Sequence, residues 1–156
     1  MLDTQVTSVF TSVKGYASRM TGIPAALVRV LVVDDDELVR KFVDRVLREA
    51  GYQTAQASSG PEAIAVAATL ETFDLLVTDV MMPEMTGDEL ARRLRQNGPD
   101  LKVLYLTGFS DHLFKEKVTL WEDEAFLEKP CGAKALLEAV SLLLFGRVQA
   151  PRPFTS

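Results

Sequence analysis

Residues 73–87 read FDLLVTDVMMPEMTG, and this stretch decides the fold. Its apolar run ends at Asp79 and is followed by two methionines, a proline and a glycine. A short, unbroken apolar run bounded by turn-forming residues is typical of a parallel strand that is buried on both faces. Taken alone, an aspartate after such a strand is most often a solvated loop residue, so its meaning depends on the rest of the chain.

The rest of the chain alternates apolar runs of strand length with segments of helical periodicity. The runs predict strands at residues 28–33, 52–57, 74–78, 102–107 and 124–128. The periodic segments predict helices over residues 39–50, 60–70, 88–97 and 132–145, with one more of undefined ends between Phe109 and Asp123. This alternation indicates an α/β fold, in which helices cover both faces of an open parallel sheet and the crossovers are right-handed.

Composition and charge narrow the class of protein. The 156 residues are enough for one domain with a substantial core, and 47% hydrophobic with 25% charged residues is ordinary for a globular protein. The net charge of −5 argues against non-specific nucleic-acid binding, and the single Cys131 excludes an internal disulfide. No apolar run approaches the roughly 20 residues of a membrane span, and the amino terminus lacks a signal-peptide pattern. We therefore expect a protein of the reducing cytoplasm.

Four of the predicted strands end in residues that can carry chemistry. In open parallel sheets, ligands bind outside the carboxyl ends of the strands. The residues brought to that edge are Asp34, Asp35, Asp36, Asp79, Thr107, Gly108, Glu128, Lys129 and Pro130. Crowded carboxylates need a neutralising cation, and oxygen ligands partly shared with water suit Mg²⁺. An aspartate beside that ion can attack phosphorus, while Lys129, Thr107 and backbone N–H groups hold the phosphoryl oxygens.

Four motifs give these residues a family resemblance. VLVVDDD, LLVTDVMMPEMTG, VLYLTG and FLEKP, in this order and spacing, resemble the receiver domain of bacterial response regulators over about residues 28–146. The resemblance implies a flavodoxin-like (βα)5 fold, a doubly wound five-stranded parallel sheet of strand order 2-1-3-4-5. It also implies a two-component switch rather than an enzyme. Such a switch catalyses only its own phosphorylation and dephosphorylation. The phosphoryl group would come from a sensor histidine kinase or a phosphotransfer protein, and phosphorylation would change contacts with a downstream protein target.

The resemblance also implies the roles of the residues at the acidic edge. Asp79 corresponds to the phosphoacceptor. Asp34 and Asp35 correspond to the acidic pair that binds Mg²⁺ together with Asp79, and Met81 to a metal ligand through its backbone carbonyl. Asp36 is left without an implied role.

Further roles follow from the remaining motifs. Thr107 and Lys129 correspond to the pair that senses the phosphoryl group, and the Lys129–Pro130 bond to one that is usually cis in the family. Phe126 corresponds to the switch aromatic, although a plain core residue is the alternative for this position.

The first predicted helix has one apolar residue outside its core stripe. Its inward set is Val39, Phe42, Val43, Val46 and Leu47. Leu38 falls off this stripe and next to the acidic residues. Because the family docks histidine-bearing helices at this place, we expect Leu38 to face a partner.

A phosphatase remains the alternative from another functional class. Asp34 and Asp36 have the D-x-D spacing of haloacid-dehalogenase-type phosphatases, with Asp34 as nucleophile and Asp36 as acid/base. That family would predict a longer chain with a cap insertion and a later acidic pair, and neither is found in the sequence. A receiver that has lost phosphorylation is disfavoured, because every residue that the reaction needs is present.

The ends of the chain raise a separate hypothesis. We expect an amino-terminal extension over residues 1–27, the receiver over 28–146 and a tail over 147–156, as in a stand-alone receiver or one from a hybrid kinase. The last helix has one polar stripe, which predicts an exposed apolar patch that includes Leu137 and Phe145. The extension repeats Val6, Val9, Phe10 and Val13 at helical spacing. It is either a disordered linker or a helix that packs on the last helix, within one chain or across a homodimer.

Overall fold

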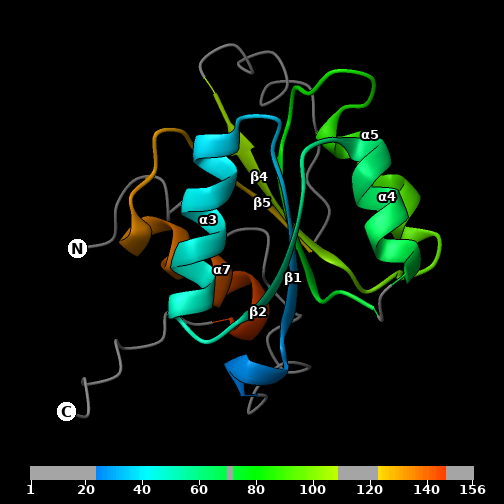
Figure 1. Ribbon diagram of the computed structural model, residues 1–156. Coiled ribbons are helices and arrows are strands. Elements are labelled where there is room, and N and C mark those ends of the chain that lie inside the picture. The colour runs from blue at the N-terminus through cyan, green and yellow to red at the C-terminus, as the bar shows by residue number, and fades with distance from the viewer. Residues whose placement is uncertain (1–23, 70–71, 109–122, 147–156) are drawn as a thin grey trace.

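The computed structural model describes residues 24–69, 72–108 and 123–146, and in this part five strands form one parallel sheet (Figure 1). The order across the sheet is β2-β1-β3-β4-β5, which confirms the predicted order. The strands are β1 (Arg29–Val33), β2 (Gln53–Ala57), β3 (Leu75–Asp79), β4 (Lys102–Thr107) and β5 (Glu124–Glu128).

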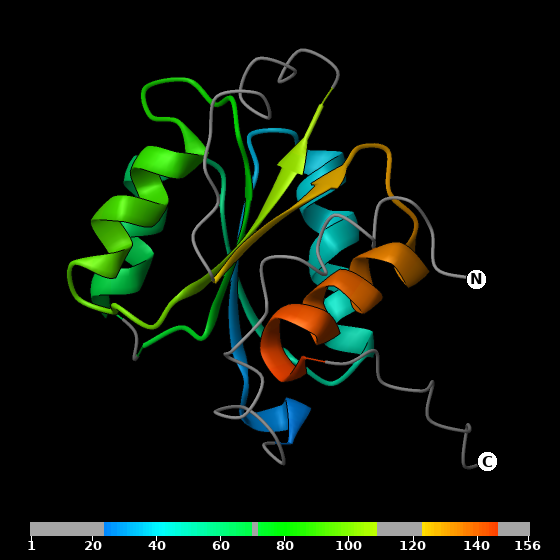
Figure 2. The same ribbon diagram turned by 180° about the vertical axis from the view of Figure 1, so that it is seen from behind.

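Helices cover both faces of this sheet. They are the 3-10 turn η1 (Ala25–Leu27) and the α-helices α3 (Glu37–Glu49), α4 (Gly60–Thr69), α5 (Gly87–Arg95) and α7 (Ala133–Phe145). Figures 1 and 2 show α3 and α7 together on one face and α4 and α5 on the other. The helix expected between Phe109 and Asp123 falls in a segment outside the described residues. Within residues 24–69, 72–108 and 123–146, every helix falls short of the length and apolar character that a membrane crossing needs.

Two apolar clusters hold the three layers together, because each inner strand alternates its side chains between the faces. Val30 and Val32 of β1 belong to the cluster under α3 and α7, whereas Leu31 and Val33 belong to the one under α4 and α5. All five residues of β3 are buried. The unbroken apolar character of these strands in the sequence is therefore the consequence of burial on both faces.

The parallel register brings the strand ends to one edge. Val33 pairs with Thr78, Asp79 pairs with Leu106, and Thr107 pairs with Glu128. The residues that follow β1, β3 and β5 therefore emerge within reach of one another. This edge is where the sequence predicted the site.

Helix α3 departs from its predicted inward stripe. Phe42 was expected in the core but remains 39% exposed, while Asp44, which was not in the predicted stripe, is buried. Asp44 tolerates burial because its carboxylate accepts a hydrogen bond from the Thr54 hydroxyl (2.5 Å) and pairs with Arg48 (3.3 Å). The polar strand β2 thus offers α3 a hydrogen-bonding partner, Thr54, whereas the predicted stripe assumed that α3 buries only apolar residues.

Helix α7 also differs from expectation. Phe145 was predicted to lie in an exposed patch, but it is buried, and Leu137 is partly buried against the core. The prediction was wrong because Phe145 packs into the apolar cluster that α7 shares with α3 and the sheet.

Candidate functional site

The centre of the site is a lysine held between two buried aspartates. Lys129 Nζ lies 2.9 Å from Asp34 Oδ2 and 3.2 Å from Asp79 Oδ1. Asp34 follows β1, Asp79 is the last residue of β3, and Lys129 follows β5, so three strands contribute one group each. Both carboxylates are buried, and a single ammonium cannot neutralise both of them.

A third carboxylate completes a possible cation site. Oxygen atoms from Asp34, Asp35 and Asp79 all lie within 4.8 Å of one another, with Asp35 exposed and the other two buried. The donors are all carboxylate oxygens and one side is open to water, which is the ligand set that Mg²⁺ prefers. Met81 lies in the loop two residues after Asp79, with its side chain turned outward. These residues therefore fit the predicted Mg²⁺.

Thr107 contributes a buried hydroxyl at the end of β4. Its Oγ1 has no hydrogen-bond partner within the described part of the chain. A buried hydroxyl without a partner is costly, so its presence needs a reason such as an absent ligand. The backbone N–H of Lys129 donates to the Thr107 carbonyl (2.7 Å), which ties the ends of β4 and β5 together. The hydroxyl is thus a donor that is available to an anion bound at this edge.

The protonation states at the site follow from burial and charge. Burial raises the pKa of Asp79 from its ordinary 3.8 to about 6; the Lys129 ammonium opposes the shift and the Asp34 carboxylate adds to it. Burial also raises the pKa of Asp34. For Lys129, burial acts to lower the pKa, but the hydrogen bonds and charges of Asp34 and Asp79 outweigh it and raise the pKa. At neutral pH, Asp79 is therefore an ionised carboxylate beside a protonated lysine.

The raised pKa of Asp79 predicts a pH-dependent loss of stability. Because its folded-state pKa (about 6) exceeds the unfolded value (3.8), the ionised form disfavours folding, and the unfolding free energy should fall as the pH rises between these values. Without divalent cations, Asp79→Asn should therefore be more stable than the wild type at about pH 7, by on the order of 2 kcal/mol, and by little at about pH 4. Urea denaturation in EDTA measures both differences. A mutant of equal or lower stability at about pH 7 would contradict this electrostatic account.

The loop after β3 is folded back tightly on the strand. Val80 N–H donates to Asp79 Oδ1 (2.9 Å), and the N–H of Gly87 donates to the Val80 carbonyl (2.8 Å). A Cβ at Gly87 would lie only 2.2 Å from the Asp79 carbonyl oxygen. A residue without a side chain is therefore required at Gly87, where α5 begins against the backbone of Asp79.

Asp36, which the sequence left without a role, is the N-cap of α3. Its Oδ1 accepts hydrogen bonds from the backbone N–H groups of Leu38 (2.9 Å) and Val39 (3.4 Å). Its own N–H donates to Asp34 Oδ1 (2.9 Å), so the cap also holds Asp34. An aspartate immediately before a helical period is a cap signal, and it could have been found in the sequence.

A buried polar network beside the predicted switch residue was missed. The Tyr105 hydroxyl donates to Glu124 Oε2 (2.6 Å), and Arg95 Nη1 lies 3.4 Å from Glu124 Oε1. Burial, followed by the Glu124 charge, raises the pKa of Tyr105, so the phenol stays protonated and donates. Tyr105 pairs in register with Phe126, which is partly buried against the same cluster. A tyrosine inside an apolar strand signals that a partner for its hydroxyl is needed, but does not say which.

The peptide bond between Lys129 and Pro130 is cis, as the sequence resemblance implied.

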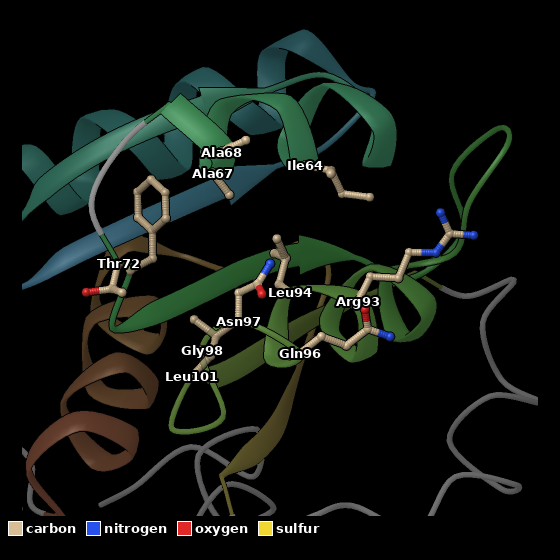
Figure 3. A pocket seen from close by; sticks show the side chains of 11 residues that line it. Ile64, Ala67, Ala68, Thr72, Arg93, Leu94, Gln96, Asn97, Gly98 and Leu101 are labelled. Atoms are coloured by element: carbon tan, nitrogen blue, oxygen red, sulfur yellow. The ribbon is translucent and has the colours of Figure 1, made fainter.

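A cavity of about 520 Å³ lies away from this edge, between α4 and α5 (Figure 3). Its walls include Ile64, Leu94 and Leu101, and the described residues that line it include no carboxylate. The carboxylates that can hold a cation are therefore at the strand ends and not among the described residues of the cavity.

Comparisons with known proteins agree with this geometry. The family model described as "Response regulator receiver domain" matches residues 30–141. The response regulator receiver protein CpdR of Brucella abortus is 35% identical over 116 residues, which are 74% of this chain and 96% of that protein. The sensor kinase CckA of the same organism is 36% identical over 116 residues, 74% of this chain but only 12% of the kinase. The crystal structure of a response regulator receiver protein from Sinorhizobium medicae superposes with a TM-score of 0.66 at 29% identity, covering 75% of this chain and 94% of that one.

The phosphatase alternative is not supported. The family that matches is not the phosphatase family. Asp36, which the phosphatase alternative needs as its acid/base, instead caps the amino terminus of α3 with its carboxylate. The sheet order, the acidic edge and the family match agree with one another. The chain therefore belongs to the response regulator receiver domain family.

Proposed function

We propose that Asp79 is the residue on which this receiver accepts its phosphoryl group. The observation that carries the proposal is the arrangement around its carboxylate. Lys129 Nζ lies 3.2 Å away, and the buried Thr107 hydroxyl without a partner in the described chain stands at the same edge. An anion covalently attached to Asp79 would satisfy the charge of Lys129 and the hydroxyl of Thr107 together.

The reaction is a displacement at phosphorus. An oxygen of the Asp79 carboxylate attacks the phosphorus of a phosphohistidine, the new P–O bond forms, and the P–N electron pair leaves with the imidazole. Lys129 stabilises the charge of the phosphoryl oxygens as a hydrogen-bond donor. Asp34, Asp35 and Asp79, whose carboxylate oxygens lie within 4.8 Å of one another, would hold Mg²⁺ together with the Met81 backbone carbonyl, and the ion would supply positive charge that offsets the phosphoryl oxygens and the crowded carboxylates.

Phosphorylation would be passed on through Thr107 and Phe126. Thr107 moves toward the phosphoryl group to donate its hydroxyl hydrogen, which vacates space at the end of β4. The Phe126 ring, two residues from the end of the neighbouring strand β5, then turns inward over Tyr105, its partner in register. The Phe126 ring is partly buried in this structure, which leaves room for a change in exposure that a downstream protein can read.

Labelling with a small phosphodonor tests the proposed function. With Mg²⁺ and acetyl phosphate, the full chain should gain the mass of one phosphoryl group, and the bond should resist acid and break in base, as an acyl phosphate does. EDTA should suppress the gain. A chain that gains no mass under these conditions, while its circular dichroism shows it to be folded, would contradict the proposal.

The partner for phosphotransfer is proposed to dock on α3. Leu38 is 81% exposed and Phe42 39% exposed, and at a spacing of four residues they lie on the same side of the helix. They begin two residues after the acidic Asp36, so this apolar ridge leads up to the site. A histidine-bearing helix of a sensor kinase or phosphotransfer protein can bury these two side chains while presenting its phosphohistidine to Asp79.

Leu38→Glu should separate docking from chemistry. We expect the rate of phosphotransfer from the kinase to fall roughly tenfold or more, because a charge replaces an apolar contact in a small interface. Labelling by acetyl phosphate should not change. Leu27→Glu is the matched control, since Leu27 is also exposed but lies before β1, at the opposite edge of the sheet. Equal loss of both reactions in Leu38→Glu, or equal loss of transfer in Leu27→Glu, would rule out a docking role.

The wider setting is also a proposal. We propose that the chain works in the cytoplasm with a histidine kinase or phosphotransfer protein and a downstream protein target. The net charge of −5 disfavours direct binding to nucleic acid.

A further inference from the structure

Helix α3 carries a cation near the end where a helix disfavours one. Arg40 is the fourth residue of α3 and so closes its first turn. The amino terminus of a helix carries a partial positive charge, which acidic side chains stabilise and basic side chains do not. Arg40 therefore needs an interaction that outweighs this unfavourable position.

The guanidinium of Arg40 reaches back over the first turn to the end of β1. Its Nη1 donates a hydrogen bond to the main-chain carbonyl of Asp34 at 2.9 Å. The direction follows from helix geometry, because the side chains of a helix lean toward its amino terminus. Glu37, an acidic neighbour on the same helix, pairs with Lys41 at 2.8 Å. The guanidinium thus acts on the backbone of the acidic edge.

The Asp34 carbonyl lies just beyond the ladder of the sheet. β1 ends at Val33, which pairs in register with Ala57 and Thr78. The Asp34 N–H still donates to the Ala57 carbonyl (3.3 Å), whereas the Asp34 carbonyl, within the described residues, accepts its hydrogen bond from Arg40. Arg40 therefore takes the place of a strand partner for this carbonyl.

This carbonyl belongs to the peptide group that joins Asp34 to Asp35. A peptide group is planar, so a bond that holds its oxygen also fixes the direction in which the chain continues at Asp35. The Asp34 carboxylate has further support, because it accepts from the Asp36 N–H (2.9 Å) and pairs with Lys129 (2.9 Å). Asp34 is also buried, whereas Asp35 is exposed. The bond from Arg40 therefore matters most for the direction of Asp35.

We propose that Arg40 is a positioning residue for the cation site, which holds the peptide plane between Asp34 and Asp35 so that the Asp35 carboxylate stays close to those of Asp34 and Asp79. The inference rests on the Mg²⁺ site proposed above, whose three carboxylates lie within 4.8 Å of one another. Arg40 has only donor groups and is not itself a ligand. Removal of a group that orients metal ligands typically weakens metal binding by tenfold or more.

Charge alone predicts the opposite effect. Removing a cation near three carboxylates should tighten the binding of Mg²⁺, because a repulsive charge is lost. Loss of the positioning bond should weaken the binding. Lys41 is the matched control for charge, since the hydrogen bond and charge of Lys41, followed by the charge of Arg40, lower the pKa of Glu37. Both cations therefore act on the same part of α3, and Arg40 is the one bonded to the Asp34 carbonyl.

Thermal unfolding of the full chain at a series of Mg²⁺ concentrations tests the proposal, because an ion that binds the folded state raises the melting temperature. The dissociation constant from this series should rise roughly tenfold in Arg40→Gln. Arg40→Lys, which keeps the charge and a donor, should recover most of the affinity. Lys41→Gln, the same change at the neighbouring residue, should bind Mg²⁺ as the wild type does or more tightly. Labelling of Arg40→Gln by acetyl phosphate should need a correspondingly higher Mg²⁺ concentration.

The outcomes separate this inference from the proposed function. If Mg²⁺ does not stabilise the wild type, the cation site and the role of Arg40 both fall. If Mg²⁺ binds the wild type and binds Arg40→Gln equally or more tightly, Arg40 does not position the site, although the site itself stands. Equal weakening in Arg40→Gln and Lys41→Gln would also overturn the proposal. The loss of one partly buried hydrogen bond costs about 1 kcal/mol, so Arg40→Gln should remain folded, which urea denaturation in EDTA checks.

Discussion

Asp79→Asn is expected to abolish labelling by acetyl phosphate, with a fall in rate of at least about 100-fold. The physical reason is the loss of the nucleophile, because an amide oxygen carries no full negative charge with which to attack phosphorus. The amide is almost the same size as the carboxylate, and its oxygen can still accept the hydrogen bond from Val80 N–H. The loss of labelling therefore reports on chemistry and not on a distorted loop. Intact-protein mass spectrometry after incubation with Mg²⁺ and acetyl phosphate measures it.

Asp34→Asn is the companion variant. Asp34 also lies beside Lys129, at 2.9 Å, and is also buried, so it matches Asp79 in environment. We expect this variant to be labelled slowly but on Asp79, since it weakens the cation site and leaves the nucleophile in place. Peptide mapping would identify the labelled residue. Labelling that persists in Asp79→Asn and disappears in Asp34→Asn would move the phosphoacceptor to the end of β1.

Gly87→Ala is expected to lower the unfolding free energy by roughly 2–3 kcal/mol, the upper range for an overpacked site. The added Cβ would lie 2.2 Å from the Asp79 carbonyl oxygen and 3.1 Å from Thr78 Cγ2. The first of these is backbone of a strand that is buried along its whole length, so it cannot move aside as a side-chain tip could. Relief requires α5 or the end of β3 to shift, and either shift displaces Asp79. Urea denaturation should show the loss, and labelling by acetyl phosphate should slow with it.

Gly132→Ala is the matched control for Gly87→Ala. Both glycines stand at the start of a helix, but a Cβ at Gly132 would meet no atom within 4 Å. Gly132 is the N-cap of α7, where alanine is less favourable than glycine, so the unfolding free energy should fall by up to about 1 kcal/mol, clearly less than in Gly87→Ala. If both variants lost the same stability, or if Gly87→Ala lost none, the close approach to Asp79 would not be what requires a glycine.

Most of the fold was predictable from local pattern. The apolar runs placed β1, β3 and β4 to within a residue or so, and the order of the strands followed from the family resemblance and is confirmed. The remaining differences are single residues at the ends of elements. β3 was expected to stop before Asp79 but includes it, and α5 was expected from residue 88 but begins at Gly87. In both places the backbone is held by the fold of the loop between Val80 and Gly87, which a local pattern does not contain.

The side-chain faces of the helices were less predictable. A helical wheel gives the direction of each residue but not what the neighbouring element offers it. Phe42 is 39% exposed, whereas Asp44 is buried because β2 presents the Thr54 hydroxyl to its carboxylate. Phe145 is buried because it packs into the apolar cluster that α7 shares with α3 and the sheet. Such outcomes depend on partners that lie elsewhere in the sequence.

By itself, the sequence determined which residues stand at the strand ends and therefore which groups could meet. The spacing of apolar residues and the positions of turn-forming residues are local properties of the sequence. In a parallel sheet they are enough to place Asp34, Asp79, Thr107 and Lys129 at one edge. Only the tertiary structure decided how these groups interact. Lys129 reaches Asp34 across 95 residues of chain, the Thr107 hydroxyl is left without a partner in the described residues, and burial brings the pKa of Asp79 to about 6. Distances of a few ångströms and the removal of water set these energies, and both arise only when strands that are far apart in sequence pack side by side.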